Sequence, residues 1–453
     1  MFLRYPSPAP IMGGLRTAGR ETASEVAPPP PAPRRVAAAP GPLSALETGV
    51  GPPFAAPAKP PLRLVLTKSV VAAAFLAGLV LSRRLWLTTR SFPHAPVADW
   101  LPAVRAPFDA ILYGLLIALL LAIVVLPRPR WFIVAFVTLA AGWMLWDQTR
   151  WQPWVYQYLF LLAALALYPW KRERDVPAEQ RALNACRVII AFTYLYSGLQ
   201  KLNANFFADT AIWLLEPIVR AVPEQVGEVL MSARVVIPFV ETTIGAALLI
   251  NPVRTIGVAL AIAMHLFILV SIGPFGHNWN TTVWPWNLAM IALVLTLFGN
   301  VPRLEPRRLL WGPPRAVFPK VVLLLFGVMP LLSFLGWWDL YLSSALYSGN
   351  TPRATLEFGG DFYRSLPERV RDVCYPWDPP GRHGVALLDW SMAELNVPPY
   401  PAERVFRSVG REVARRTSTH ADRDVALQID GRPNRNRVRK ATHLRSDELL
   451  RGP

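Results

Sequence analysis

Lys201, at the end of a long apolar run, is the residue of this sequence best placed to do chemistry. It closes the stretch YLYSGLQK and follows Tyr194 by seven residues and Ser197 by four. This spacing puts the three side chains on one face of a helix. Gly198 beside them leaves room for another backbone or a flat ligand. The pattern predicts a polar stripe directed into a helix bundle.

Two further polar residues lie inside the next apolar runs. Glu241 stands in PFVETTIGAALL, ahead of the small residues Gly245 and Ala246, and His265 stands in AIAMHLFILVSIG. Small residues favour close helix contact. An ionisable side chain within an apolar span is costly, so each is a functional hypothesis, and both are expected to face the bundle interior.

The segment GPFGHNWNTTVWPWN is too rich in amides and indoles for an ordinary connection. Stacking and amide hydrogen bonds are what a flat ring needs in a pocket. The residues expected to line such a pocket are His277, Asn278, Trp279, Asn280, Trp284 and Trp286. The simpler alternatives are an aromatic belt for the tryptophans, a satisfied core position for His265 and an interfacial anchor for Lys201.

The elements that position these residues are predicted to be membrane-spanning helices. The chain has 453 residues, 53% of them hydrophobic and only 17% charged, with 17 Trp. Several apolar runs have about the length that a hydrocarbon core of roughly 30 Å requires. The fold class is therefore an all-α polytopic membrane protein, multi-pass, in the plasma or inner membrane if the source is bacterial.

About nine transmembrane helices are expected within a transmembrane domain at 62–339, preceded by a disordered Pro/Ala/Arg-rich tail at 1–61. Their predicted ranges are 64–81, 109–126, 131–146, 154–169, 184–200, 234–250, 254–273, 284–299 and 319–338. Lys68 and Asp109 lie near helix ends, where snorkelling explains them. Asn203 and Asn205 are expected to cap or break the helix that carries Lys201.

The net charge of +17 lies largely in short loops and tails, so topology explains it better than nucleic acid does. Four loops rich in arginine and lysine mark one side as cytoplasmic and leave the C-terminal region outside. Arg83, Arg84, Arg90 and Arg105 in one further loop argue the other way. The predicted partner is the lipid bilayer, with no nucleic acid.

Residues 340–453 are expected to form a small extramembrane α/β cap, which is a candidate surface for a protein partner, followed by a frayed basic tail. The strand-like piece RATLEF and the basic amphipathic stretch ERVFRSVGREVARR support this division. The two cysteines, Cys186 and Cys374, offer neither a CxxC pair nor a metal site, and a disulfide between them is not expected. No metal is predicted.

The order GLQKLNANF, then ETTIGAALL, then a histidine followed by SIGPF resembles the vitamin-K-dependent gamma-carboxylase-like family, whose membrane core is the horizontally transferred transmembrane (HTTM) domain. The resemblance is specific from about 184 to 300. It implies a hydroquinone-epoxidising enzyme in which Lys201 is the base, His265 assists, and a reduced naphthoquinone is the cofactor. Asn203 and Asn205 stand where the family has aspartates, which suggests carboxylate-poor surroundings that favour a neutral amine.

Three functions therefore remain open. The first is a carboxylase-like enzyme that uses Lys201 as general base, with Tyr194, Ser197, Gly198, Glu241 and the 277–286 segment holding the ring. The second is a non-catalytic membrane scaffold or partner subunit. The third is a transporter with a path lined by Glu241, His265 and Lys201, although the chain has no convincing internal repeat.

Overall fold

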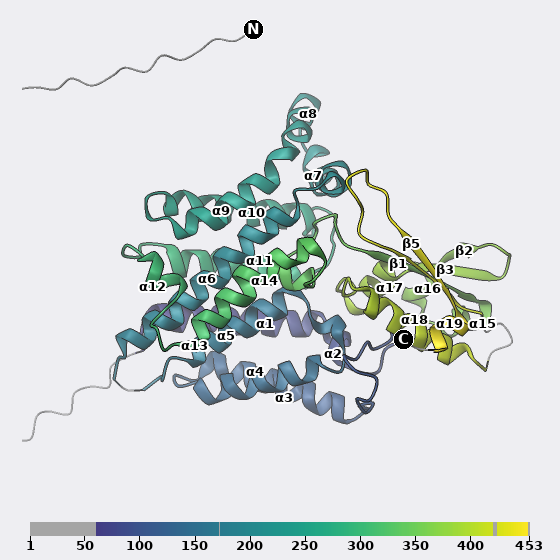
Figure 1. Ribbon diagram of the computed structural model, residues 1–453, viewed down its shortest axis with the longest axis horizontal. Coiled ribbons are helices and arrows are strands. Elements are labelled where there is room, and N and C mark those ends of the chain that lie inside the picture. The colour runs from purple at the N-terminus through teal and green to yellow at the C-terminus, as the bar shows by residue number, and fades with distance from the viewer. Residues whose placement is uncertain (1–59, 172, 420–423, 452–453) are drawn as a thin grey trace, which may run out of the picture. The chain divides into compact units, whose positions relative to one another are not determined.

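The computed structural model describes residues 60–171, 173–419 and 424–451, and it is mostly helical (Figure 1). The predicted tail lies outside the described residues apart from its last two positions. Within the described residues, six helical segments are long and apolar enough to cross a membrane, so the chain is a multi-pass integral membrane protein. They are α1 (Leu62–Leu81), α3 (Phe108–Val125), α6 (Val176–Gln200), Glu224–Leu249, Asn251–Ile272 and Val317–Leu335.

The last three segments are runs of shorter helices. They comprise α8 (Glu224–Ala233), η3 (Arg234–Val236) and α9 (Ile237–Leu249); η4 (Asn251–Val253) and α10 (Arg254–Ile272); and α13 (Val317–Val322), η5 (Leu323–Val328), α14 (Met329–Leu332) and η6 (Ser333–Leu335). Short helices connect the longer ones. They are α2 (Arg83–Trp86), η1 (Gln148–Arg150), η2 (Phe206–Thr210), α7 (Ala211–Val219), α12 (Pro306–Leu310) and η7 (Tyr341–Ser343).

The prediction of nine spans is not confirmed. Three of the expected spans are shorter helices: α4 (Arg130–Met144), α5 (Pro153–Ala166) and α11 (Val283–Phe298). Helices of 14 to 16 residues rise only about 21 to 24 Å. That is less than a hydrocarbon core of roughly 30 Å.

Helices α6 and α9 pack in direct backbone contact. A Cβ atom added at Gly198 would lie 2.4 Å from the backbone nitrogen of Thr242, and one added at Gly245 would lie 2.5 Å from that of Leu195. These distances are too short for any side chain, so both positions require glycine. The predicted roles of Gly198 and Gly245 in close helix contact are confirmed.

Polar side chains terminate the helices. Asn203 confirms its predicted capping role, because its amide donates to Gln200 O at the end of α6 while its Oδ1 accepts from Phe206 N. The snorkelling prediction for Lys68 and Asp109 is wrong, since both side chains are buried. Lys68 Nζ donates to Val124 O and Leu126 O at the end of α3, which satisfies orphan carbonyls there. Asp109 accepts from the backbone and hydroxyl of Thr88.

The C-terminal region forms an antiparallel sheet with the strand order β2-β3-β1-β4-β5, accompanied by helices (Figure 1). The strands are β1 (Arg353–Gly359), β2 (Tyr375–Trp377), β3 (Arg382–Ala386), β4 (Ala426–Asp430) and β5 (Ala441–Arg445). The helices are α15 (Gly360–Ser365), α16 (Glu368–Arg371), α17 (Leu387–Leu395), α18 (Glu403–Thr417) and α19 (Ser446–Arg451). This fold confirms the RATLEF strand and the basic amphipathic helix.

A row of buried aliphatic side chains crosses this sheet. Leu356 of β1 is opposite Val385 on one side and Leu427 on the other, and Leu427 is in turn opposite Leu444. Gly410 brings α18 against Leu427. The frayed tail expected after α18 is therefore wrong over residues 426–445, because alternating apolar residues in ALQID and ATHLR continue the sheet.

Buried carboxylates fasten this C-terminal domain to the membrane part. Glu394 of α17 has a fully buried side chain and accepts from Ser91 N at 2.8 Å, Ser91 Oγ at 2.5 Å and Phe92 N at 2.7 Å. These residues belong to the loop between α2 and α3. The domain is therefore seated on that loop by charge-assisted hydrogen bonds.

The same loop is held to the end of α4 by a second carboxylate. Asp147 pairs with Arg90 at 2.5 Å, with both side chains fully buried. Burial alone would raise the pKa of Asp147, but the neighbouring Arg90, His94 and Arg150 side chains and the Arg90 hydrogen bond lower it to about 2. Because the folded-state pKa is depressed, this contribution to stability is present near neutral pH and is lost as the pH falls through about 2.

We predict that Glu394→Gln destabilises the protein by about 2 to 4 kcal/mol, because an amide NH2 then faces donors that need an acceptor. Thermal unfolding in detergent should show a melting temperature several degrees lower. The matched control is Glu412→Gln, whose partner Arg416 and own side chain are each 35% exposed, so its cost should stay below about 1 kcal/mol. Equal effects of the two substitutions would contradict the anchoring role of Glu394.

Candidate functional site

A small cavity lies between α6, α9, α10 and α11, and it brings together the main residues that the sequence pointed to. Its volume is about 60 Å³. Tyr194, Ser197, Lys201, Glu241, His265 and Trp286 all line it, together with a segment that precedes the C-terminal sheet. The prediction that the Tyr194, Ser197 and Lys201 side chains share one helix face is confirmed.

Lys201 forms a buried ion pair across the contact between α6 and α9. Its ammonium lies 2.6 Å from Glu241 Oε2 and 2.7 Å from Ser197 Oγ, and the two charged side chains are 9% and 7% exposed. The expectation of carboxylate-poor surroundings is therefore wrong. The carboxylate that stabilises the ammonium comes from a different helix. Asn203 and Asn205, which stand where the gamma-carboxylase-like family has aspartates, therefore give no indication of it.

A second chain of hydrogen bonds links α6, α10 and α11. Tyr194 OH lies 2.7 Å from His265 Nε2, and His265 Nδ1 lies 2.7 Å from Asn287 Oδ1. The Asn287 amide nitrogen donates to Val283 O, which identifies Oδ1 as the acceptor. His265 Nδ1 therefore carries a proton and donates to Asn287 Oδ1, and His265 Nε2 shares a hydrogen bond with the Tyr194 hydroxyl. Glu241 and His265 are both buried, which confirms that they face the bundle interior.

Three residues of this network were not singled out from the sequence. Besides Asn287, they are Gln157 and Thr193: Trp286 donates to Gln157 Oε1 at 2.7 Å, and Gln157 donates to Thr193 Oγ1 at 3.0 Å. All three are uncharged polar side chains inside apolar helices. Uncharged polar residues within apolar runs are visible in the sequence. They indicate a functional site less strongly than ionisable residues do, because one backbone carbonyl can satisfy an amide or a hydroxyl.

The six residues of the 277–286 segment that were predicted to line a flat-ring pocket are not brought together, and of these six Trp286 alone lines the cavity. His277 stacks on Trp213 of α7 with ring centroids 4.2 Å apart, and Trp279 also contacts Trp213. The remaining members have structural roles. Asn278 and Asn280 adopt left-handed backbone conformations, Asn280 also donates to Tyr347, and Trp284 donates to the Ile272 and Trp279 carbonyls.

The geometry limits what the cavity can hold. A volume of about 60 Å³ corresponds to one or two waters at roughly 30 Å³ each. Small-molecule sites usually measure about 300 Å³ or more. The reduced naphthoquinone stays a prediction from the resemblance, and it would require this site to open. Among the described residues, no group of three or more His, Cys, Asp or Glu side chains could hold a metal ion, and Cys186 and Cys374 are free.

The fold and this intramembrane polar network define the class as a multi-pass integral membrane protein. Residues 179–281 match the family model of the methylamine utilisation protein MauE. This match spans α6 to α10, with Lys201, Glu241 and His265 inside it, and covers less than a quarter of the chain. No curated protein and no solved structure matches.

The match corrects two expectations. The family indicated is MauE, not the gamma-carboxylase-like or HTTM family, and a carboxylase-like enzyme is not supported. The resemblance depended on a short motif around Lys201 and on the order of two later residues. Buried polar residues at such spacings also serve helix packing, so the motif alone did not specify the chemistry.

We predict that Lys201→Met and Glu241→Leu each lower the melting temperature strongly, because each leaves an uncompensated charge inside the bundle, at a cost of roughly 3 to 5 kcal/mol. The double variant should regain most of the loss. Differential scanning fluorimetry of the full chain in detergent measures this.

The matched control is the exposed pair of Arg220 and Glu216 on and after α7, whose side chains are 74% and 38% exposed. Its single substitutions should cost less than about 1 kcal/mol. Additive losses in the Lys201 and Glu241 double variant would show that the two residues do not stabilise the bundle as a pair.

Proposed function

We propose that this chain is a non-catalytic membrane accessory protein that holds its C-terminal α/β domain at one face of the membrane as a docking platform. The observation that carries the proposal is the internal pairing of Lys201 with Glu241. Lys201 and Glu241 satisfy each other at 2.6 Å across the contact between α6 and α9. This pairing and the close helix contact give the intramembrane polar residues a structural role.

The docking platform is supported by the sheet of the C-terminal domain. Its helix-covered face carries the aliphatic row described above, whereas Thr355, Gln428 and His443 form a polar row on the opposite face and are half-buried or exposed. Strands β2 and β5 lie at the two edges of the sheet. Strand edges offer unpaired backbone groups to which a partner segment can add.

The name of the matching family suggests the process. We propose that the partner takes part in methylamine utilisation and that the accessory protein acts on that partner at the membrane surface. The length of the C-terminal region outside the matched residues makes it the part of the chain that would determine partner choice.

We also propose that the three shorter helices cross the membrane with the six longer ones, with local thinning of the bilayer accommodating their length. This gives nine spans, a cytoplasmic N-terminus and an external C-terminal domain. Arg63 at the start of α1 donates to carbonyls at the end of α11, and Lys68 to carbonyls at the end of α3. The opposite end of α1 contacts Asn396 of the C-terminal domain. The start of α1 thus lies beside the ends of α3 and α11, as expected if these helices cross the bundle in the direction opposite to α1.

We predict that a host strain lacking this gene grows normally on ammonium but loses growth on methylamine. The full chain should restore growth. The Lys201→Met/Glu241→Leu double variant should do so in proportion to its level in the membrane, because the only role expected of Lys201 and Glu241 is to pair with each other. Growth curves and an immunoblot of the membrane fraction measure this. A well-folded double variant that gives no growth would contradict the non-catalytic role, and unimpaired growth of the deletion strain would contradict the link to methylamine.

We predict that cysteines introduced at the exposed positions Ala204 and Ala441 react with an impermeant maleimide in intact cells, because both lie on the side of the C-terminal domain. Cysteines at Arg128 and Arg315 should react only after permeabilisation. The parent chain carries Cys374→Ser to remove the half-buried native thiol, while Cys186 is fully buried. Labelling of all four positions from one side would overturn the nine-span topology.

A further inference from the structure

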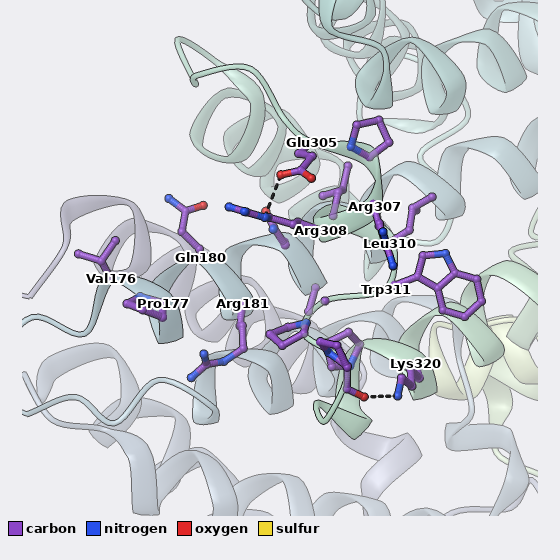
Figure 2. Close-up of a pocket in the computed structure, with 18 residues that line it drawn as sticks. Val176, Pro177, Gln180, Arg181, Glu305, Arg307, Arg308, Leu310, Trp311 and Lys320 are labelled. Atoms are coloured by element: carbon purple, nitrogen blue, oxygen red, sulfur yellow. Dashed lines mark hydrogen bonds and ion pairs between the residues drawn. The ribbon is translucent and has the colours of Figure 1, made fainter.

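An open depression with a volume of about 1240 Å³ lies between the first turns of α6 and the α12–α13 segment (Figure 2). Gln180 and Arg181 line it from α6, and Arg307, Arg308, Trp311 and Lys320 line it from the other side. Two candidate membrane spans begin at its edge, one with α6 and one at Val317. The depression therefore lies where the bundle meets the membrane boundary.

The depression carries an excess of positive charge. Its one carboxylate, Glu305, pairs with Arg308 at 2.8 Å (Figure 2). The nearby Glu179 is taken up by Arg174. Arg181, Arg307 and Lys320 are thus left without a carboxylate partner among the described residues, with Arg181 on the α6 side of the depression and Arg307 and Lys320 on the opposite side (Figure 2).

Arginines elsewhere at this end of the bundle are used differently. Arg63, Arg187 and Arg254 donate to backbone carbonyls at the end of α11 or just beyond it. The side chains of Arg181 and Arg307 make no hydrogen bond or ion pair within the described residues, and the Lys320 ammonium donates to Pro314 O. The guanidinium groups of Arg181 and Arg307 are available for a ligand, and a guanidinium binds phosphate oxygens in a bidentate manner.

The rim of the depression is apolar on the side of the membrane span. Trp311 is 55% exposed and Val317 is 70% exposed. Indole rings are typical of the headgroup level of a bilayer, where one part of the ring meets lipid and another meets water. A ligand that fits both halves has a phosphate at one end and hydrocarbon at the other.

We propose that this depression binds the headgroups of anionic phospholipids, with Arg181 contacting phosphate on the α6 side, Arg307 and Lys320 contacting phosphate on the opposite side, and Trp311 contacting the glycerol and upper acyl region. A free phosphate ester shares the headgroup chemistry, but it would leave the exposed Trp311 and Val317 without a partner. The inference is independent of the proposed accessory function, because it requires only that the depression lie at the membrane boundary.

Native mass spectrometry of the full chain in detergent tests the proposal by counting retained lipid. Phosphatidylglycerol is the probe, phosphatidylcholine is the zwitterionic comparison and glycerol phosphate is the soluble competitor. The Arg181→Gln/Arg307→Gln/Lys320→Gln variant should need at least tenfold more phosphatidylglycerol for equal retention. The matched control, Arg128→Gln/Arg130→Gln/Arg303→Gln, removes the same charge from positions outside the depression and should retain lipid like the native chain.

Three results would overturn the proposal. Equal losses of lipid in the two triple variants would indicate general charge attraction, and displacement of the lipid by glycerol phosphate at similar concentration would indicate a soluble phosphate ligand. Retention of phosphatidylcholine equal to that of phosphatidylglycerol would also contradict it. If the triple variant does not fold, Arg307→Gln alone at its exposed position replaces it. That variant should weaken retention about threefold, and unchanged retention would also overturn the proposal.

Discussion

The direct contact between α6 and α9 is the constraint on which the membrane part of this protein depends. Lys201 and Glu241 are each costly to bury alone, and their pairing across this contact offsets much of that cost. The two backbones can approach closely enough because glycine stands at positions 198 and 245. The hydrogen bonds from Tyr194 to His265 and on to Asn287 then tie α10 and α11 to the same arrangement. One pair of helices thus determines how four pack.

The same constraint limits the chemistry available at the site. Each strongly polar group that lines the cavity has a partner from another helix or from its own turn, and the remaining space is about 60 Å³. A satisfied network of this kind makes a bundle rigid and specific. Rigidity is what a protein needs when its task is to present an attached domain.

Much of this architecture can be read from the sequence, because apolar runs and rare ionisable residues are strong signals in membrane proteins. Lys201, Glu241 and His265 stand out individually for that reason. Their pairing does not, because it depends on the rotation of each helix and on contacts between residues 40 or more positions apart. The carboxylate-poor surroundings of Lys201 were inferred from neighbours along the chain, whereas the decisive carboxylate is a neighbour only in space.

The C-terminal domain shows a related limit. Residues 426–445 are rich in arginine, and this composition masks the short apolar alternation that completes the sheet. A strand such as β5 has too few apolar residues to be stable alone. It is held by backbone pairing with β4 and by the contact of Leu444 with the shared core. Pairing of this kind becomes visible only once the partner strand is placed.

Arg90 illustrates why charge counting along a membrane protein needs the structure. In the sequence it belongs to a loop whose four arginines oppose the topology indicated by the other loops. In the fold its side chain is buried and neutralised by Asp147, and it helps to hold the loop on which the C-terminal domain is seated. The positive-inside rule concerns charges that meet the membrane surface and its potential. A buried and paired arginine does not meet either of them, so the loop opposes the proposed orientation less strongly than its composition suggests.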